Sequence, residues 1–136
     1  MLFLDANVAV DLLNARRLAV RERYDEARGL GMRLALSTIA LFELRYGAAN
    51  SDRVERNTRA LDALLEDGFD VVAFDAADAA EAGAIRAHLR RAGTPIGPYD
   101  ILIAAAARRR GVVLVTANGR EVARVPGLIV TDWAAT

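Results

Sequence analysis

The feature that most constrains the fold is the alternation of short apolar runs with longer segments of helical spacing. Parallel strands need such crossover helices, and strands buried on both faces read as continuous apolar runs. There is no repeat, low-complexity segment or linker. We therefore expect one domain over residues 1–136 of class α/β, a three-layer α/β/α domain with a mostly parallel central sheet. The expected strands are residues 2–5, 34–36, 70–74, 112–115 and 128–130.

Local signals mark the ends of several expected helices. Ser37 or Thr38 can cap a helix over residues 39–49, and Asp75 can cap another over residues 76–92. Pro98 suits the first position of a helix that runs to residue 110. The other expected helices cover residues 7–14, 17–28, 53–67 and a short segment near 120–124.

The basic residues exclude whole classes of chemistry, because all 18 are arginines. GC-rich coding accounts for this bias, yet a chain without lysine has neither a P-loop nor a Schiff base. The absence of cysteine removes disulfides, thiolate nucleophiles and thiolate metal sites. Aspartates and glutamates together also number 18, so the chain has no net positive charge that would attract a polyanion. No run reaches the ~18 apolar residues of a membrane span, and the start lacks a signal peptide's basic region, so we expect a cytoplasmic protein.

Three carboxylates stand out because each lies within apolar sequence. Asp5 ends the first expected strand, where open α/β sheets place their chemistry, but it could equally cap the following helix. Glu43 has apolar or small neighbours at helical spacing, so it either reaches solvent at the helix edge or needs a partner or cation. Asp100 lies in the first turn of an apolar helix, where the helix dipole contributes only ~0.3–1 kcal/mol. The helix dipole accounts for an acid in a first turn, but it does not account for an acid on a helix whose other residues are so apolar.

Asn118 is a fourth candidate, just beyond the clearest strand. With Glu121 three residues later it matches a capping box, a role that is compatible with binding a ligand. In a parallel sheet Asp5, Asn118 and the start of the Glu43 helix lie at one edge, with Asp100 on a helix nearby. Clustered carboxylates need a cation or a raised pKa, and oxygen ligands without histidine or cysteine suit Mg²⁺ or Mn²⁺. Such an ion can bind phosphate oxygens and activate water.

Four segments carry a resemblance to a known family, and they run in family order across nearly the whole chain. They are Leu-Asp-Ala-Asn at 4–7, Ser-Thr-Ile-Ala-Leu-Phe-Glu-Leu-Arg-Tyr-Gly-Ala at 37–48, Gly-Thr-Pro-Ile-Gly-Pro-Tyr-Asp-Ile-Leu-Ile-Ala-Ala at 93–105 and Leu-Val-Thr-Ala-Asn-Gly-Arg-Glu at 114–121. Together they resemble the PIN-domain ribonucleases, and among these the VapC toxins of prokaryotic toxin–antitoxin pairs.

The resemblance implies a Mg²⁺- or Mn²⁺-dependent endoribonuclease that acts as the toxin of a VapBC-type pair and inhibits translation. Cleavage would leave a 5′-phosphate and a 3′-hydroxyl. Asp5, Glu43 and Asp100 would be the metal ligands, and Asn118 the fourth catalytic residue, supported by Thr116. The resemblance also implies a homodimer, an RNA substrate and a VapB-type antitoxin whose C-terminal segment lies along an apolar groove to the active site. Operator DNA would be bound only through the antitoxin.

One departure concerns Asn118, because many PIN domains have aspartate at this position. The loss of one negative charge disfavours a strongly bound second metal, and Glu121 could supply that charge instead. Two alternative functions remain open: a PIN-domain RNA-processing nuclease outside a toxin pair, and a metal-free PIN interaction module. A phosphatase or receiver domain is excluded, since those need a lysine and a second acid near Asp5.

Other side chains have expected roles of lesser weight. We expect Asn7 to orient Asp5 or its water, and Tyr99 either to stack on a base or to join the core. Arg86 could reach a phosphate. Arg108–Arg110 could follow RNA, but cations at a helix C-terminus are more simply explained by the dipole. His88, the single histidine, is expected on the surface.

Overall fold

The strands form one five-stranded sheet, and every pairing is parallel. They are β1 (Leu2–Leu4), β2 (Leu34–Ser37), β3 (Phe69–Val72), β4 (Val113–Val115) and β5 (Val130–Thr131), in the order β3-β2-β1-β4-β5. The computed structural model describes residues 1–135, so residue 136 of the expected domain lies outside the described part. Strand β1 is central, with Leu2 opposite Leu34 on one side and opposite Val113 on the other.

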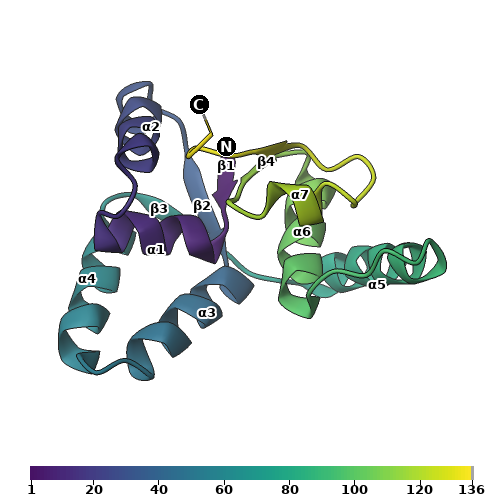
Figure 1. The fold of residues 1–136 in the computed structure, drawn as a ribbon, viewed down its shortest axis with the longest axis horizontal. Helices are drawn as coiled ribbons and strands as arrows, with labels where there is room; N and C mark the ends of the chain where they lie inside the picture. Colours follow the sequence, from purple (N-terminus) through teal and green to yellow (C-terminus); the bar gives the residue numbers. More distant parts are fainter. Residues whose placement is uncertain (136) are drawn as a thin grey trace.

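The helices cover the two faces of this sheet. They are α1 (Ala6–Asn14), α2 (Leu18–Gly29), α3 (Thr38–Ala49), α4 (Val54–Glu66), α5 (Ala76–Arg91), α6 (Pro98–Arg110) and α7 (Gly119–Val122). The chain steps from β1 to β3 in one direction along the sheet and from β3 to β5 in the other, so right-handed crossovers put the later helices on the opposite face. Figure 1 shows α1, α2 and α4 on one side of the strands and α5, α6 and α7 on the other. The predicted α/β/α class is confirmed, with a sheet that is parallel throughout.

Most predicted boundaries lie within two residues of those observed, and the caps explain why. Helix α6 runs from Pro98 to Arg110 as predicted, and the Asp75 carboxylate caps α5 by accepting from the Asp78 N–H. Strand β3 ends earlier than predicted, because the Phe74 N–H donates to Thr38 Oγ1 (3.0 Å) instead of continuing the ladder. No helix among residues 1–135 is both long enough and apolar enough to span a membrane.

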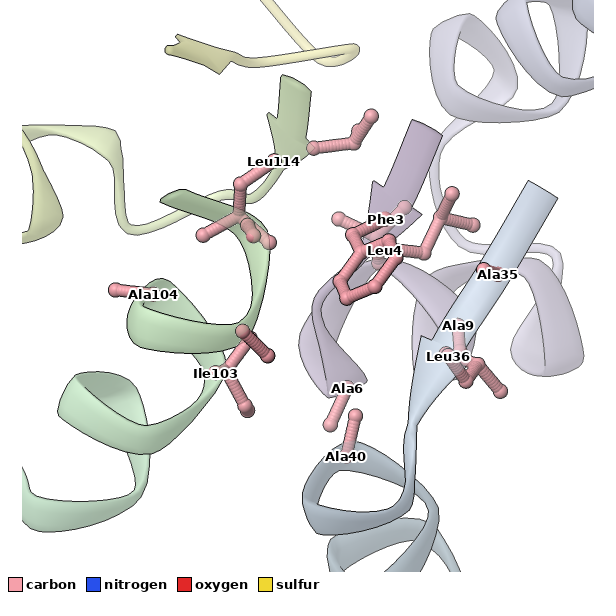
Figure 2. Close-up of a cluster of buried hydrophobic side chains, with 14 of the residues drawn as sticks. Phe3, Leu4, Ala6, Ala9, Ala35, Leu36, Ala40, Ile103, Ala104 and Leu114 are labelled. Atoms are coloured by element: carbon pink, nitrogen blue, oxygen red, sulfur yellow. The ribbon is translucent and has the colours of Figure 1, made fainter. Parts of the chain in front are cut away.

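The core lies between β1 and the helices on both faces. Phe3 and Leu4 of β1 are fully buried, and Figure 2 shows Phe3 facing Ile103 of α6. Four consecutive alanines, at 104–107, are also buried on α6. Because four consecutive residues point to different sides of a helix, their burial means that this part of α6 is packed all round.

Candidate active site

Asp5 follows β1 directly, and its carboxylate is held by two donors. Oδ1 accepts from the N–H of Ala6 (2.8 Å), so the capping role is confirmed, and Oδ2 accepts from Thr116 Oγ1 (2.8 Å) beyond β4. The residue is 4% exposed. Burial raises the pKa of Asp5, while the bonds from Thr116 and Ala6 act in the opposite direction. The two donors therefore fix the orientation of a carboxylate that carries a cost of desolvation.

Glu43 lies in the second turn of α3, half-buried. Figure 2 shows the methyl groups of Ala6 and Ala40 pointing toward one another, so small side chains let the first turns of α1 and α3 approach. Burial raises the pKa of Glu43 first, and the negative charges of Asp5 and Asp100 raise it further. Three acids separated by up to 95 residues thus lie close enough to influence one another's ionisation.

Asp100 occupies the first turn of α6. Burial raises its pKa most, and the charges of Asp5 and Glu121 add to this effect, whereas a hydrogen bond from Asn118 opposes it. Gly97 precedes the helix as its N-cap, and a Cβ added there would lie 3.3 Å from Asp100 Oδ2. A glycine at 97 therefore leaves room for the carboxylate in its observed position.

The Asn118 side chain does not cap α7, so the capping box expected of Asn118 and Glu121 is wrong. Its Nδ2 donates to Glu121 Oε2 (2.8 Å) and to Asp100 Oδ2 (3.3 Å). Glu121 Oε1 accepts from the N–H of Gly97 (3.2 Å), and these two bonds lower the pKa of Glu121. The Asn118 N–H, which a capping box would pair with the Glu121 carboxylate, donates instead to Thr116 Oγ1 (3.0 Å). Asn118 and Glu121 thereby tie α7 to the start of α6.

Asn7 also differs in part from its expected role. Its side chain is exposed, and Oδ1 accepts from the N–H of Ala117 (3.3 Å) rather than binding Asp5. It therefore holds the segment after β4, whose Thr116 is the residue that binds Asp5. Orientation of Asp5 by Asn7 remains a prediction, and in this structure it would act through Thr116.

The donor set of the three acids suits a hard divalent cation. Their carboxylates supply oxygen ligands without histidine or cysteine, and their mutual repulsion is an electrostatic cost that a bound cation would relieve. As the side chains stand, residues 1–135 contain no group of three or more acid, histidine or cysteine side chains arranged to hold a metal ion. Glu43 has no hydrogen-bond partner among those residues, so no bond has to break for its carboxylate to turn toward the other two.

The arginines at the end of α6 are engaged in ion pairs that their position alone did not predict. Arg109 Nε lies 2.6 Å and an Arg110 nitrogen 2.7 Å from Oδ1 of Asp78, whose side chain is fully buried on α5. Arg108 pairs with Glu81 (3.2 Å). The helix dipole therefore describes these arginines incompletely, because they join α6 to α5.

Two exposed aromatic rings flank the acids. Tyr99 is 46% exposed, which excludes a core role, and its ring meets that of Phe42, 51% exposed, edge to face at 5.6 Å between centroids. Sequence reasoning missed Phe42, although a signal existed: each aromatic directly precedes one of the acids, Glu43 or Asp100. His88 is exposed, as predicted.

The fold and the site together define a class: a parallel α/β domain with acids gathered where the strand order reverses, between β1 and β4. A family model described as PIN domain matches residues 2–128. The chain belongs to the PIN-domain family and, within it, to the VapC group.

Similar proteins cover almost the whole chain. The sequence is 40% identical over 131 residues to the tRNA(fMet)-specific endonuclease VapC of Shigella flexneri, covering 96% of each chain. A crystal structure of DNA-bound VapBC from Salmonella typhimurium matches with a TM-score of 0.88 and 39% identity over 97% of each chain. The structure of VapBC2 from Rickettsia felis, bound to a DNA fragment from its promoter, matches with a TM-score of 0.90 and 31% identity, covering 98% of this chain and 99% of that one. The predicted resemblance is confirmed.

Proposed function

We propose that the protein is a metal-dependent endoribonuclease, folded as a single domain over residues 1–136, and the toxin of a VapBC-type pair. The observation that carries the proposal is the convergence of Asp5, Glu43 and Asp100 at the edge of the sheet. Burial raises the pKa of all three, and the charge of Asp5 raises the pKa of Glu43 and Asp100 further. Full-length similarity to proteins named as VapC ribonucleases supports the same activity.

Asp5, Glu43 and Asp100 would hold Mg²⁺ or Mn²⁺. When bound, such an ion supplies positive charge at phosphate oxygens and lowers the pKa of water. The chain's own contribution is orientation: Thr116 holds Asp5, and Asn118 holds Asp100 through its amide. Water adds to phosphorus and the bond to the 3′-oxygen breaks, which leaves a 5′-phosphate and a 3′-hydroxyl that takes up the proton.

A groove beside the acids fits the proposed antitoxin. A hollow of about 280 Å³ lies between α1, α3 and α4. Apolar residues such as Leu13, Leu44 and Leu61 line it together with the polar side chains of Asn14, Arg56 and Asn57. Glu43 lies on its wall, so the groove leads to the acidic site. An antitoxin segment seated there would block access to the acids while burying apolar surface. Operator DNA would be bound through the antitoxin, and the toxin would act as a homodimer in the cytoplasm.

The test is cleavage of RNA by the purified protein in the presence of Mg²⁺ or Mn²⁺. The substrate named for the Shigella relative, tRNA(fMet), is the first RNA to try. We expect Asp5→Asn and Asp100→Asn to reduce cleavage at least 100-fold while remaining folded, and chelation by EDTA to abolish it. Asp62→Asn, at an exposed ion pair on α4, is the control and should retain activity. Cleavage that survives in both site variants would refute the proposal.

Two further measurements separate the alternatives. Isothermal titration with Mn²⁺ should show binding that Asp5→Asn weakens, whereas no binding above pH 6 would favour a metal-free interaction module. Growth arrest on expression, reversed by the product of a neighbouring small gene, distinguishes a toxin from an RNA-processing nuclease.

A further inference from the structure

Helix α5 is divided into an acidic half and a basic half. The acidic half ends at Glu81, and its carboxylates bind the arginines at the end of α6. The basic half carries Arg86, Arg90 and Arg91, all of which are exposed. None of these three has an ion-pair partner among residues 1–135, so their charges are available to a ligand.

The helix dipole accounts for only part of this basic half. Arg90 and Arg91 lie in the last turn of α5, where cations are favoured by the carbonyl ends of the helix. Arg86 lies before the last turn, beyond the reach of that effect. The helix dipole therefore does not account for the place of Arg86.

Three hollows on the surface meet at Arg86. One runs along α5 past Arg90, another passes Pro98 and Leu102, and the third passes Ile96 and Pro98. No carboxylate of the described residues lines any of the three. After α5 the chain runs back along that helix before α6 begins (Figure 1), and residues of α5, of this returning segment and of α6 line the hollows. The groove made by these hollows, which we call the α5 groove, therefore reaches Pro98, two residues before Asp100.

The exposed pair of Phe42 and Tyr99 lies at the same end of α6. Phe42 and Tyr99, which are 51% and 46% exposed, form an edge-to-face pair that offers apolar ring surface to solvent beside the site acids. Unpaired bases stack on such rings, and proteins that hold single strands combine them with a positively charged groove.

We propose that the α5 groove holds the single-stranded segment of the RNA substrate next to the bond that is cleaved. Arg86 contacts a phosphate, Arg90 and Arg91 extend the contact along the strand, and Phe42 with Tyr99 stacks an unpaired base. The proposal rests on the ribonuclease activity proposed above and names the surface that receives the substrate.

The test measures RNA binding without cleavage. Fluorescence anisotropy in EDTA follows a labelled single-stranded RNA of mixed sequence on the full chain, over a series of salt concentrations. Removing one arginine that binds a phosphate of a single strand lowers the slope of log affinity against log salt by about 0.7. We expect Arg86→Ala to lower the slope by the amount for one arginine, and the double variant Arg90→Ala/Arg91→Ala to lower it by about twice that amount. The matched control is Arg16→Ala/Arg23→Ala, because both arginines are exposed and lack ion pairs within the described residues.

Stacking and cleavage provide independent readouts. Tyr99→Leu should weaken binding of the single strand about tenfold, and a duplex of the same sequence, whose bases are paired, should be unaffected by it. In Mn²⁺, Arg86→Ala should raise KM for RNA more than it lowers kcat.

The outcomes separate this proposal from the one on which it rests. Wild-type cleavage with salt slopes that are equal in the Arg86 and control variants overturns the α5 groove and leaves the ribonuclease intact. A protein that neither binds nor cleaves RNA overturns both. The proposal is also overturned if the Arg86 variant binds RNA as tightly as the wild type but has a lower mass in light scattering. That result would show that this face is an interface between copies of the chain.

Discussion

Replacing Asp78 by asparagine removes the carboxylate on which the packing of α5 against α6 depends. This side chain is fully buried, and it accepts from Arg109 (2.6 Å), from Arg110 (2.7 Å) and from the Asp75 N–H (3.1 Å). Asparagine keeps the shape and one acceptor oxygen but not the charge. The substitution therefore isolates the electrostatic part of the interaction.

The size of the effect follows from the pKa of Asp78. Despite burial, which acts to raise it, the hydrogen bonds from Arg110 and Arg109 hold this pKa at about 2, against an ordinary value of 3.8. Each pKa unit corresponds to 1.36 kcal/mol, so the shift represents about 2 kcal/mol of stability at neutral pH. Removing one partner of a buried ion pair costs roughly 3–5 kcal/mol. The cost here should be at or below the lower end of this range, because the two arginines retain some exposure to solvent. We expect Asp78→Asn to lower the free energy of unfolding by about 2 to 3 kcal/mol.

Urea denaturation followed by circular dichroism measures this difference. The control is Asp62→Asn, which removes an equally short bond to Arg45 (2.7 Å) between side chains that are 43% and 48% exposed. An exposed pair of this kind should cost less than about 1 kcal/mol. Equal effects of the two substitutions would refute the reasoning.

The pH dependence gives a second check. Because the folded pKa of Asp78 lies below the unfolded value, its stabilisation is complete above about pH 4 and is lost as the pH falls toward 2. The difference between wild type and Asp78→Asn should therefore shrink over this range, and a constant difference would contradict the assignment.

Three further predictions concern the site. Gly97→Ala should lower kcat roughly tenfold by displacing the Asp100 carboxylate, with the thermal midpoint nearly unchanged; equal kcat would contradict this. Thr116→Val removes a hydrogen-bond donor to Asp5 and so raises the pKa of Asp5, which should move the acid limb of the pH–rate profile to higher pH. An acid limb at the same pH as in the wild type would contradict this. In EDTA, the free energy of unfolding should fall as the pH rises through the raised pKa values of Asp5, Glu43 and Asp100, because the folded state binds more protons than the unfolded state. Saturating Mn²⁺ should remove this decline. A stability that does not change with pH in the absence of metal would count against the proximity of the three acids.

The parts predicted from sequence are those that local chemistry decides. Pro98 set the start of α6 because its ring suits the first helical turn, and Asp75 capped α5 through its own side chain. The alternation of strands and helices predicted the layers and brought Asp5 and Asn118 to one edge. Each of these inferences used residues a few positions apart or the general rules of parallel sheets.

The parts that were missed depend on partners distant in sequence. Asn118 and Glu121 form a local capping pattern, yet no side-chain cap forms, and the amide of Asn118 donates to Asp100, 18 residues away. The ion pair of Arg109 with Asp78 spans 31 residues and has no local signal. Phe42 and Tyr99 meet only when α3 and α6 are packed.

The central place of β1 has a consequence for the protein during its own synthesis. This strand is synthesised before the other four of the sheet, but one of its two neighbours is β4, and the hydroxyl that holds Asp5 belongs to Thr116, 111 residues later. A nascent chain that still has Thr116 inside the exit tunnel therefore lacks an assembled acidic site. The order in which the sheet is built therefore delays assembly of the site until β4 and the segment after it have left the ribosome.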